Sequence, residues 1–177
     1  MSSIADSCRS IKDALPPEAK DLKLNLGSVI ERSSLSDAEA AGAALAAAIM
    51  SRSVDLVEAF LSVDELDDVD RSGAKTAAAL MAMNTTWYPF IEMSDDKELE
   101  TAGAGLRMNA FTTHGGTTPQ KFELFCLAAA IVGKCHKCVS SHTATLRSSG
   151  YTTEQLRDVG RISATVAGVA VVLDTLV

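Results

Sequence analysis

Hydrophobic residues recur every three or four positions over most of this chain, which is the spacing of one face of an α-helix. The alternation of apolar and polar residues that is typical of half-buried strands is almost absent. The first clear run follows Pro16–Pro17, and prolines fit the first turn of a helix because its N–H groups are unpaired anyway. The pattern predicts an all-α fold. The apolar positions of the first run are Ala19, Leu22, Leu26, Val29 and Ile30.

Capping motifs predict where several further helices begin. A serine or threonine followed three residues later by glutamate or glutamine can pair with the first backbone N–H groups of a helix. Ser36–Glu39 precedes an alanine-rich helix, and Ser62–Glu65 precedes a helix that we expect to reach about Asn84. Thr152–Gln155 precedes a last helix that we expect to run to the C-terminus.

The middle of the chain is less regular. We expect residues 84–89 to form a loop, and we interpret Trp87 and Tyr88 within it as core or subunit contacts. Between residues 94 and 116 the pattern supports one short helix, at about 97–102.

Two helices follow this region. Thr118–Pro119 starts one with core spacing, and Gly133 ends it, since glycine is common at helix C-termini. Cys135 starts the next helix, which Gly150 closes.

The chain also contains an apparent internal repeat. Leu45–Ile49 and Leu127–Ile131 have the same sequence, Leu-Ala-Ala-Ala-Ile, at the same point in a similar order of helices. We therefore expect residues 1–177 to form a single all-α domain of two related halves, approximately 18–93 and 118–177. The first half lacks every reactive side chain found at the matching positions of the second, so the second half alone is expected to carry a site.

Composition and charge narrow the function classes. The formal net charge of −7 argues against binding nucleic acid, whose phosphates need a basic surface, and against an anionic membrane surface. The alanine-rich stretches are interrupted by charge too early for a transmembrane span, and the first residues do not resemble a signal peptide. A cytoplasmic protein is expected. In that setting a C-x2-C motif indicates catalysis or metal binding.

Cys135 and Cys138 form such a motif, and Gly133 places them at the first turn of a helix. Unpaired N–H groups and the helix dipole stabilise a thiolate there, which favours Cys135, nearest the helix start. His142 lies one turn beyond Cys138 on the same face and favours that cysteine, because a specific base can also move a proton. We therefore interpret Cys138 as the nucleophile and Cys135 as the resolving residue or proton donor.

Glu123, on the preceding helix, is the candidate partner of His142. If the chain folds back at Gly133, its carboxylate can orient the imidazole and complete a carboxylate–imidazole–thiol relay. The plainer interpretations are a first-turn carboxylate for Glu123, a solvated histidine for His142 and an inert pair of buried cysteines. We expect Cys8, in a frayed N-terminus, and Cys126, on a core helix, to be incidental. His114 is interpreted as a solvated loop residue.

A zinc site is a competing interpretation of the same residues. Cys135, Cys138 and His142 with His136 or Glu123 would provide four ligands. The C-x2-C-x3-H spacing lies within one short helix, however, whereas tetrahedral sites usually draw ligands from separate elements. We therefore predict no bound metal, and a zinc-stabilised or redox-sensing interaction module stays the non-enzymatic alternative.

At these residues the chain resembles the alkyl hydroperoxidase D family, within the wider carboxymuconolactone decarboxylase-like superfamily. The glutamate, the two cysteines and the histidine at this spacing form a specific signature. The resemblance extends from about Ile11 to Leu176. The segments that carry it, besides the motif, are 15–26, 105–109, 122–124, 145–147 and 163–170.

The resemblance implies a two-half all-α fold, usually a homotrimer, and a cytoplasmic antioxidant peroxidase. Cys138 would be the peroxidatic residue, Cys135 its proton donor and disulfide partner, and Glu123 and His142 the proton relay. No bound cofactor is implied. The implied reductant is dihydrolipoamide, carried on the acyltransferase subunit of a 2-oxoacid dehydrogenase. The implied substrates and partner are hydroperoxides and a peroxiredoxin, alkyl hydroperoxide reductase C.

One position departs from the family pattern. Family members carry histidine directly before the second cysteine, whereas this chain has Lys137 there and His136 one position earlier. Adjacent helical residues point about 100° apart, so His136 does not replace the missing side chain. Lys137 can lower the thiol pKa as a nearby cation. A decarboxylase-like member of the superfamily is the enzymatic alternative, although it would not need both cysteines.

Overall fold

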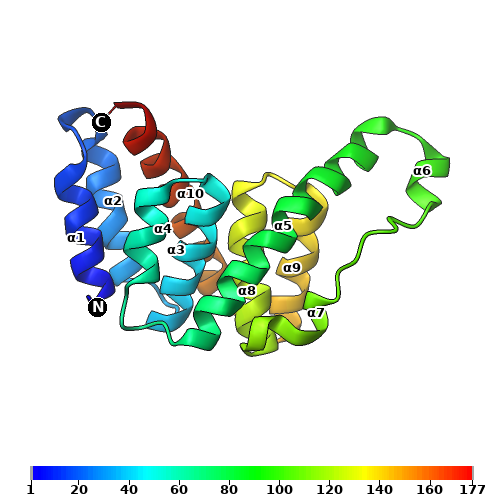
Figure 1. Cartoon of the computed structure of the whole chain (residues 1–177), viewed down its shortest axis with the longest axis horizontal. Helices are drawn as coiled ribbons and strands as arrows, with labels where there is room; N and C mark the ends of the chain where they lie inside the picture. Colours follow the sequence, from blue (N-terminus) through cyan, green and yellow to red (C-terminus); the bar gives the residue numbers. More distant parts are fainter. Residues whose placement is uncertain (1, 177) are drawn as a thin grey trace.

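The computed structural model describes residues 2–176, and helices form its architecture (Figure 1). Within these residues, strand-like pairing is limited to an isolated parallel bridge between Ser2 and Val63, so the expected all-α fold is confirmed. The longer helices are α1 (Ile4–Ala14), α2 (Lys20–Glu31), α3 (Asp37–Ser51), α4 (Val54–Leu61), α5 (Asp68–Ser94), α8 (Pro119–Val132), α9 (His136–Ser148) and α10 (Thr153–Leu176). The short ones are η1 (Pro17–Ala19), α6 (Lys97–Thr101), α7 (Ala110–Thr113) and η2 (His114–Gly116).

The alanine-rich helix α3 lies at the centre of the core. Every residue from Ala40 to Ala48 is buried, because α4, α5, α8 and α10 pack around it. Small side chains allow neighbouring helices to approach closely. At Gly42 a Cβ atom would lie 2.2 Å from the ring of Phe125 on α8, so only glycine fits there without a shift.

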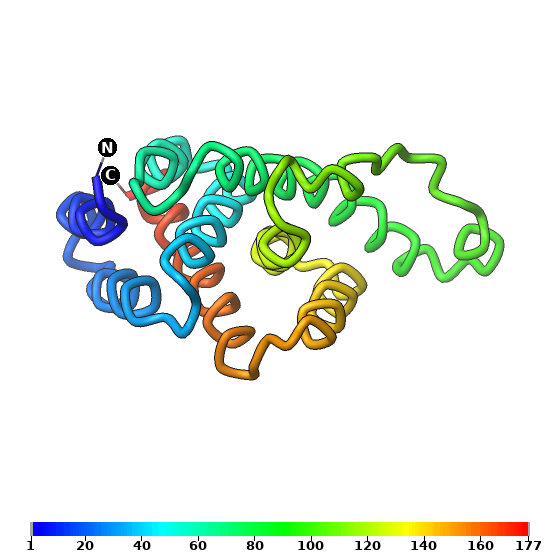
Figure 2. Tube along the Cα trace, turned by 90° about the horizontal axis from the view of Figure 1, so that it is seen from below, coloured from blue at the N-terminus to red at the C-terminus, as the bar shows by residue number. Residues whose placement is uncertain are grey.

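Helix α10 closes the other side of this core. It packs against α2, α3 and α8, and its buried positions include Val159, Ile162 and Val166. Among the described residues, α10 alone is long and apolar enough to cross a membrane by length and composition. Part of its apolar surface packs within the bundle, whereas Val171 and Leu176 are exposed. α1 and the end of α10 lie at the same end of the molecule (Figures 1 and 2).

Several local signals act as expected. Ser36 and Glu39 form a complete capping box at α3, and Thr152 and Gln155 exchange the same two hydrogen bonds at α10. Thr118 caps α8, Gly133 ends it, and the short helix α6 lies where the pattern predicted it. The internal repeat stays a prediction.

The N-terminus was wrongly expected to be frayed. α1 precedes the predicted first helix and buries Ile4, Cys8 and Ile11 against the body. Its first turn is held by Glu65, whose carboxylate accepts hydrogen bonds from the backbone N–H of Ile4 at 3.0 Å. Glu65 is therefore used in a tertiary contact, and the helix predicted to follow Ser62 begins instead with Asp67 as the cap of α5.

The loop predicted at 84–89 is also wrong, because α5 continues through these residues to Ser94 with Pro89 inside it. Three consecutive parts of the chain project from the body: the end of α5, helix α6, and the irregular segment after it up to residue 108 (Figures 1 and 2). We call residues 90–108 the arm. No residue of α6 is buried. α5 thus extends past the core and carries Tyr88 to the side of α9.

Candidate functional site

A tight turn between α8 and α9 assembles the site. Gly133 ends α8, and a Cβ atom there would lie within 2.5–2.7 Å of the Thr85 side chain of α5, so the turn needs glycine. Lys134 follows in the left-handed region with φ 55°. The chain reverses at these two residues, and α9 packs back along α8.

Cys135 and Cys138 are joined by a disulfide at the start of α9, with their Cα atoms 5.3 Å apart. Cys135 is the N-cap residue of α9, and its Sγ accepts a hydrogen bond of 3.2 Å from the backbone N–H of Cys138. The helix-dipole argument and the histidine argument from the sequence thus apply to different cysteines. The helix N-terminus is directed at Cys135, whereas Cys138 faces the histidine side of α9.

Glu123 reaches His142 as the sequence suggested. Its Oε2 lies 2.7 Å from Nδ1 of His142, and both side chains are largely shielded from water. A carboxylate on Nδ1 leaves Nε2 for the cavity and sets the tautomer of the ring. The plainer interpretation of His142 as a solvated histidine is wrong, since the residue is only 7% exposed.

Cys138, Glu123 and His142 line one small cavity of about 180 Å³, which we call the inner cavity. The Cys138 sulfur, the imidazole and the carboxylate therefore share a partly enclosed space. The other residues that line it are Asn84, Tyr88, Met108, Phe111, Lys137, Ser141 and Thr145.

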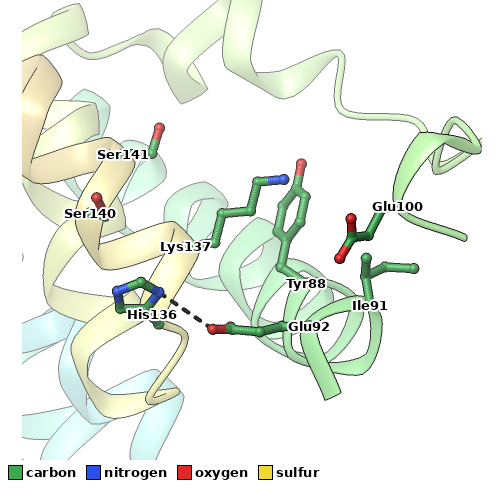
Figure 3. A pocket seen from close by; sticks show the side chains of 8 residues that line it. All are labelled: Tyr88, Ile91, Glu92, Glu100, His136, Lys137, Ser140 and Ser141. Carbon is green, nitrogen blue, oxygen red and sulfur yellow. Dashed lines mark ion pairs between the residues drawn. The ribbon is translucent and has the colours of Figure 1, made fainter. Parts of the chain in front are cut away.

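A wider cavity of about 570 Å³, the outer cavity, lies next to the inner one between α9, the end of α5 and α6 (Figure 3). Tyr88, Lys137 and Ser141 line both cavities. The ammonium group of Lys137 lies 4.9 Å from the centre of the Tyr88 ring, a cation–π contact between α9 and α5. Lys137, the residue that departs from the family pattern, thus lies on the boundary between the two cavities.

His136 points away from the reactive pair. Its side chain is 83% exposed, and its Nδ1 lies 3.5 Å from a carboxylate oxygen of Glu92 on α5 (Figure 3). The expectation that His136 does not substitute for the missing family histidine agrees with this placement.

Cys135 lines a different and more open cavity, of about 600 Å³, together with His136, Val139 and Thr143. The two cysteines therefore border different spaces, although both residues are buried. A reagent could approach the pair from two sides.

Helix α7 borders the inner cavity through Phe111, and η2 follows it directly. Phe111 of α7 stacks on His142, with ring centres 6.2 Å apart and planes at 16°. The expected solvated loop residue His114 is instead partly buried, with its ring against Phe122 at 5.5 Å. Buried Asp70 of α5 accepts a hydrogen bond from the hydroxyl of Thr117, the residue after η2, and forms an ion pair of 2.6 Å with Lys121 of α8. These contacts fix the end of η2 to α5 and α8.

The remaining cysteines are buried away from the pair. Burial raises the pKa of the Cys8 thiol to about 12 and that of the Cys126 thiol well above its usual range. Neither residue lines the inner cavity. Their incidental role stays a prediction, although Cys8 lies in a packed helix rather than a frayed end.

Metal ligation was the competing interpretation of this cluster. Among residues 2–176, no group of three or more His, Cys, Asp or Glu side chains is placed to hold a metal ion. His142 uses Nδ1 for Glu123, and His136 is directed towards Glu92.

Sequence reasoning gave no site role to several residues of the inner cavity, Asn84 and Phe111 among them. Asn84 was placed at the boundary of a loop, and Phe111 in an irregular region. No local pattern marks either residue, because each reaches the cavity only through tertiary packing.

Comparison with known proteins gives consistent matches. A model of the carboxymuconolactone decarboxylase family matches residues 97–176. Over the whole chain, the protein is 38% identical to alkyl hydroperoxide reductase AhpD of Rhodospirillum centenum, with 95% of this chain and 91% of the relative covered. The proteins of the same name from Frankia alni and Maricaulis maris are 40% and 39% identical, with 94% of this chain covered in each case and 90% and 97% of the relatives.

Proposed function

Because the chain belongs to the alkyl hydroperoxide reductase AhpD family, we propose that it reduces hydroperoxides through Cys135 and Cys138. The observation that carries the proposal is the inner cavity, which Cys138 lines together with the Glu123–His142 pair. A cysteine beside an oriented imidazole is the arrangement that favours a thiolate at neutral pH.

In the proposed reaction, the Cys138 thiolate attacks the terminal oxygen of the hydroperoxide. The S–O bond forms as the O–O bond breaks, so the sulfur is oxidised to a sulfenic acid and the alkoxide leaves. The alkoxide takes a proton from the His142 imidazolium and departs as the alcohol. The Cys135 thiol then displaces the sulfenic hydroxyl as water, and the disulfide forms.

The proposed reductant is a dithiol, dihydrolipoamide, presented by the acyltransferase subunit of a 2-oxoacid dehydrogenase. One of its thiolates attacks the disulfide, and its second sulfur resolves the mixed disulfide, which returns both cysteines to thiols. Access from the open cavity beside Cys135 supports such an exchange, since a thiolate must reach a disulfide sulfur in line. The same exchange would serve a partner peroxiredoxin, alkyl hydroperoxide reductase C.

We also propose a cytoplasmic homotrimer. The arm supports a contact between copies, because its residues Phe90, Met93 and Leu106 expose 46%, 78% and 39% of their surface. Exposed apolar side chains gathered on a projecting segment favour association.

Thiol titration and intact mass test the redox assignment. One equivalent of cumene hydroperoxide is added to the reduced wild type, to Cys138→Ser and to Cys126→Ala as a control for a cysteine outside the cavity. The wild type and the control are expected to lose two thiols and about two mass units per chain, with recovery on adding dihydrolipoamide. Cys138→Ser should not change.

Full peroxide turnover by Cys138→Ser would contradict the assignment. If the wild type loses two thiols but dihydrolipoamide does not restore them, the peroxidase half-reaction would be supported and the proposed reductant would be contradicted.

A further inference from the structure

Asn84 is the buried polar residue of α5 that faces the reactive cysteine's cavity. It is only 3% exposed, and it lines the inner cavity with Cys138 and His142. Among residues 2–176, its carboxamide oxygen is the one buried side-chain oxygen or nitrogen that lacks a hydrogen-bond partner.

Such a group is costly to the fold. Asparagine is a weak helix former, and a buried carbonyl without a partner forfeits the hydrogen bonds it made to water. Unpaired buried polar groups are rare in native proteins, and they often belong to functional sites. Asn84 carries this cost in the interior of a long helix, where alanine or leucine would be favoured.

Three ionisable groups that line the cavity already have partners there. Glu123 and His142 pair with each other, and the Lys137 ammonium lies over the Tyr88 ring. The carboxamide of Asn84 is free of protein partners, and it offers both a donor and an acceptor. Phe111 and Met108 supply apolar walls on the same cavity.

We propose that Asn84 binds the O–O–H group of the hydroperoxide and presents its terminal oxygen to Cys138. This inference rests on the proposed peroxidase function. The carboxamide oxygen accepts a hydrogen bond from the terminal O–H, and the amide N–H group donates to the oxygen that leaves. The S–O bond forms with the terminal oxygen, the O–O bond breaks, and the alkoxide gains its proton from His142. The apolar walls accommodate the alkyl group.

A hydrogen-bond partner of the peroxide should affect peroxide reduction without affecting the thiolate itself. The test therefore compares two single-turnover rates on the full-length reduced protein: oxidation by cumene hydroperoxide, and alkylation of Cys138 by iodoacetamide, which needs the thiolate but no peroxide site. The variants are Asn84→Leu, which preserves much of the volume, and Asn84→Ala, which avoids a branched side chain. Asn25→Ala, at an exposed asparagine of α2, is the matched control.

Both Asn84 variants are expected to lose about 10- to 100-fold in the peroxide rate, since the lost hydrogen bonds involve a charged transition state. Alkylation should stay within about twofold of the wild type. The melting temperature of Asn84→Leu should equal or exceed that of the wild type, because the unpaired polar group is gone. Asn25→Ala should leave both rates unchanged.

An unchanged peroxide rate in both variants would overturn the inference. Equal losses in peroxide reduction and alkylation would also overturn it, because Asn84 would then act on the thiolate or on the packing of the site. A wild type that is alkylated normally but does not react with any hydroperoxide would overturn the proposed function, and the assignment of Asn84 with it.

Discussion

The carboxylate of Glu123 lies 2.7 Å from Nδ1 of His142, although the two residues belong to different helices. The contact orients the imidazole on the cavity that Cys138 lines. By accepting a hydrogen bond from Nδ1, the carboxylate leaves Nε2 of the ring for the cavity, where it can act on the Cys138 thiol.

Glu123→Gln is expected to slow peroxide reduction and iodoacetamide alkylation of Cys138 together, by about 10- to 100-fold. The amide keeps the shape but loses the charge beside the His142 ring, so proton transfer from the Cys138 thiol to the imidazole should be less favourable. A pH profile of alkylation measures this. Glu154→Gln, at an exposed position of α10, is the control. An unaltered profile in Glu123→Gln would limit the carboxylate to a packing role.

Lys137→Met should move the pH profile of Cys138 alkylation to higher pH, since a cation on the same cavity stabilises the thiolate. The substitution also removes the contact with the Tyr88 ring, so the boundary between the cavities should loosen. Alkylation against pH measures the first effect. Lys134→Met, on the turn before the pair, removes a charge of the same kind outside the inner cavity. Equal shifts in both variants would show a general charge effect instead.

Asp158→Asn should destabilise the protein by about 1–3 kcal/mol at pH 7. Burial alone would raise the pKa of Asp158, but hydrogen bonds from the backbone N–H and hydroxyl of Ser34 and the contact with Arg161 lower it overall. A lowered pKa in the folded state means that the stabilisation is fully present above the unfolded pKa of about 4 and is lost as pH falls through the folded value.

Urea unfolding of wild type and Asp158→Asn at a series of pH values measures this difference. The two curves should converge as the pH falls below about 4. A difference that stays constant down to the lowest pH would assign the effect to packing between α10 and the α2–α3 connection. Arg157→Ala, an exposed change on the same helix, is a suitable control.

Only two of the four thiols should react rapidly in the reduced native protein. Burial raises the pKa of the Cys8 thiol to about 12 and also raises that of Cys126, so both are almost wholly protonated at neutral pH. Titration with a disulfide reagent should show two fast thiols, and two more after denaturation. Three fast thiols in the native state would contradict the burial of α1 or α8.

Local chemistry predicted much of the fold. The capping pairs Ser36–Glu39 and Thr152–Gln155 and the Thr118–Pro119 start act through neighbouring backbone, so a single sequence reveals them. The same reasoning was wrong for Glu65, because its carboxylate accepts a hydrogen bond from the backbone N–H of Ile4, which is distant in the sequence. The loop predicted at 84–89 is helical instead, and α5 accommodates Pro89 within it.

The site divides in the same way. Cys135, Cys138 and His142 follow one another on α9, so helical spacing was sufficient to group them. The approach of Glu123 depended on the turn at Gly133, which the sequence also marked. Asn84 and Phe111 come from α5 and α7, and only the packing of those elements brings them to the cavity.

The position of α10 has a consequence for the order in which the chain becomes structured during synthesis. α10 is made after every other described helix, yet it covers α2 and α3, which are made early, soon after α1. Domains generally fold as units once their core is complete. Until α10 is made, therefore, the apolar faces of the early helices lack one of the helices that they pack against. The cysteine pair also leaves the ribosome before the helical bundle around it is complete.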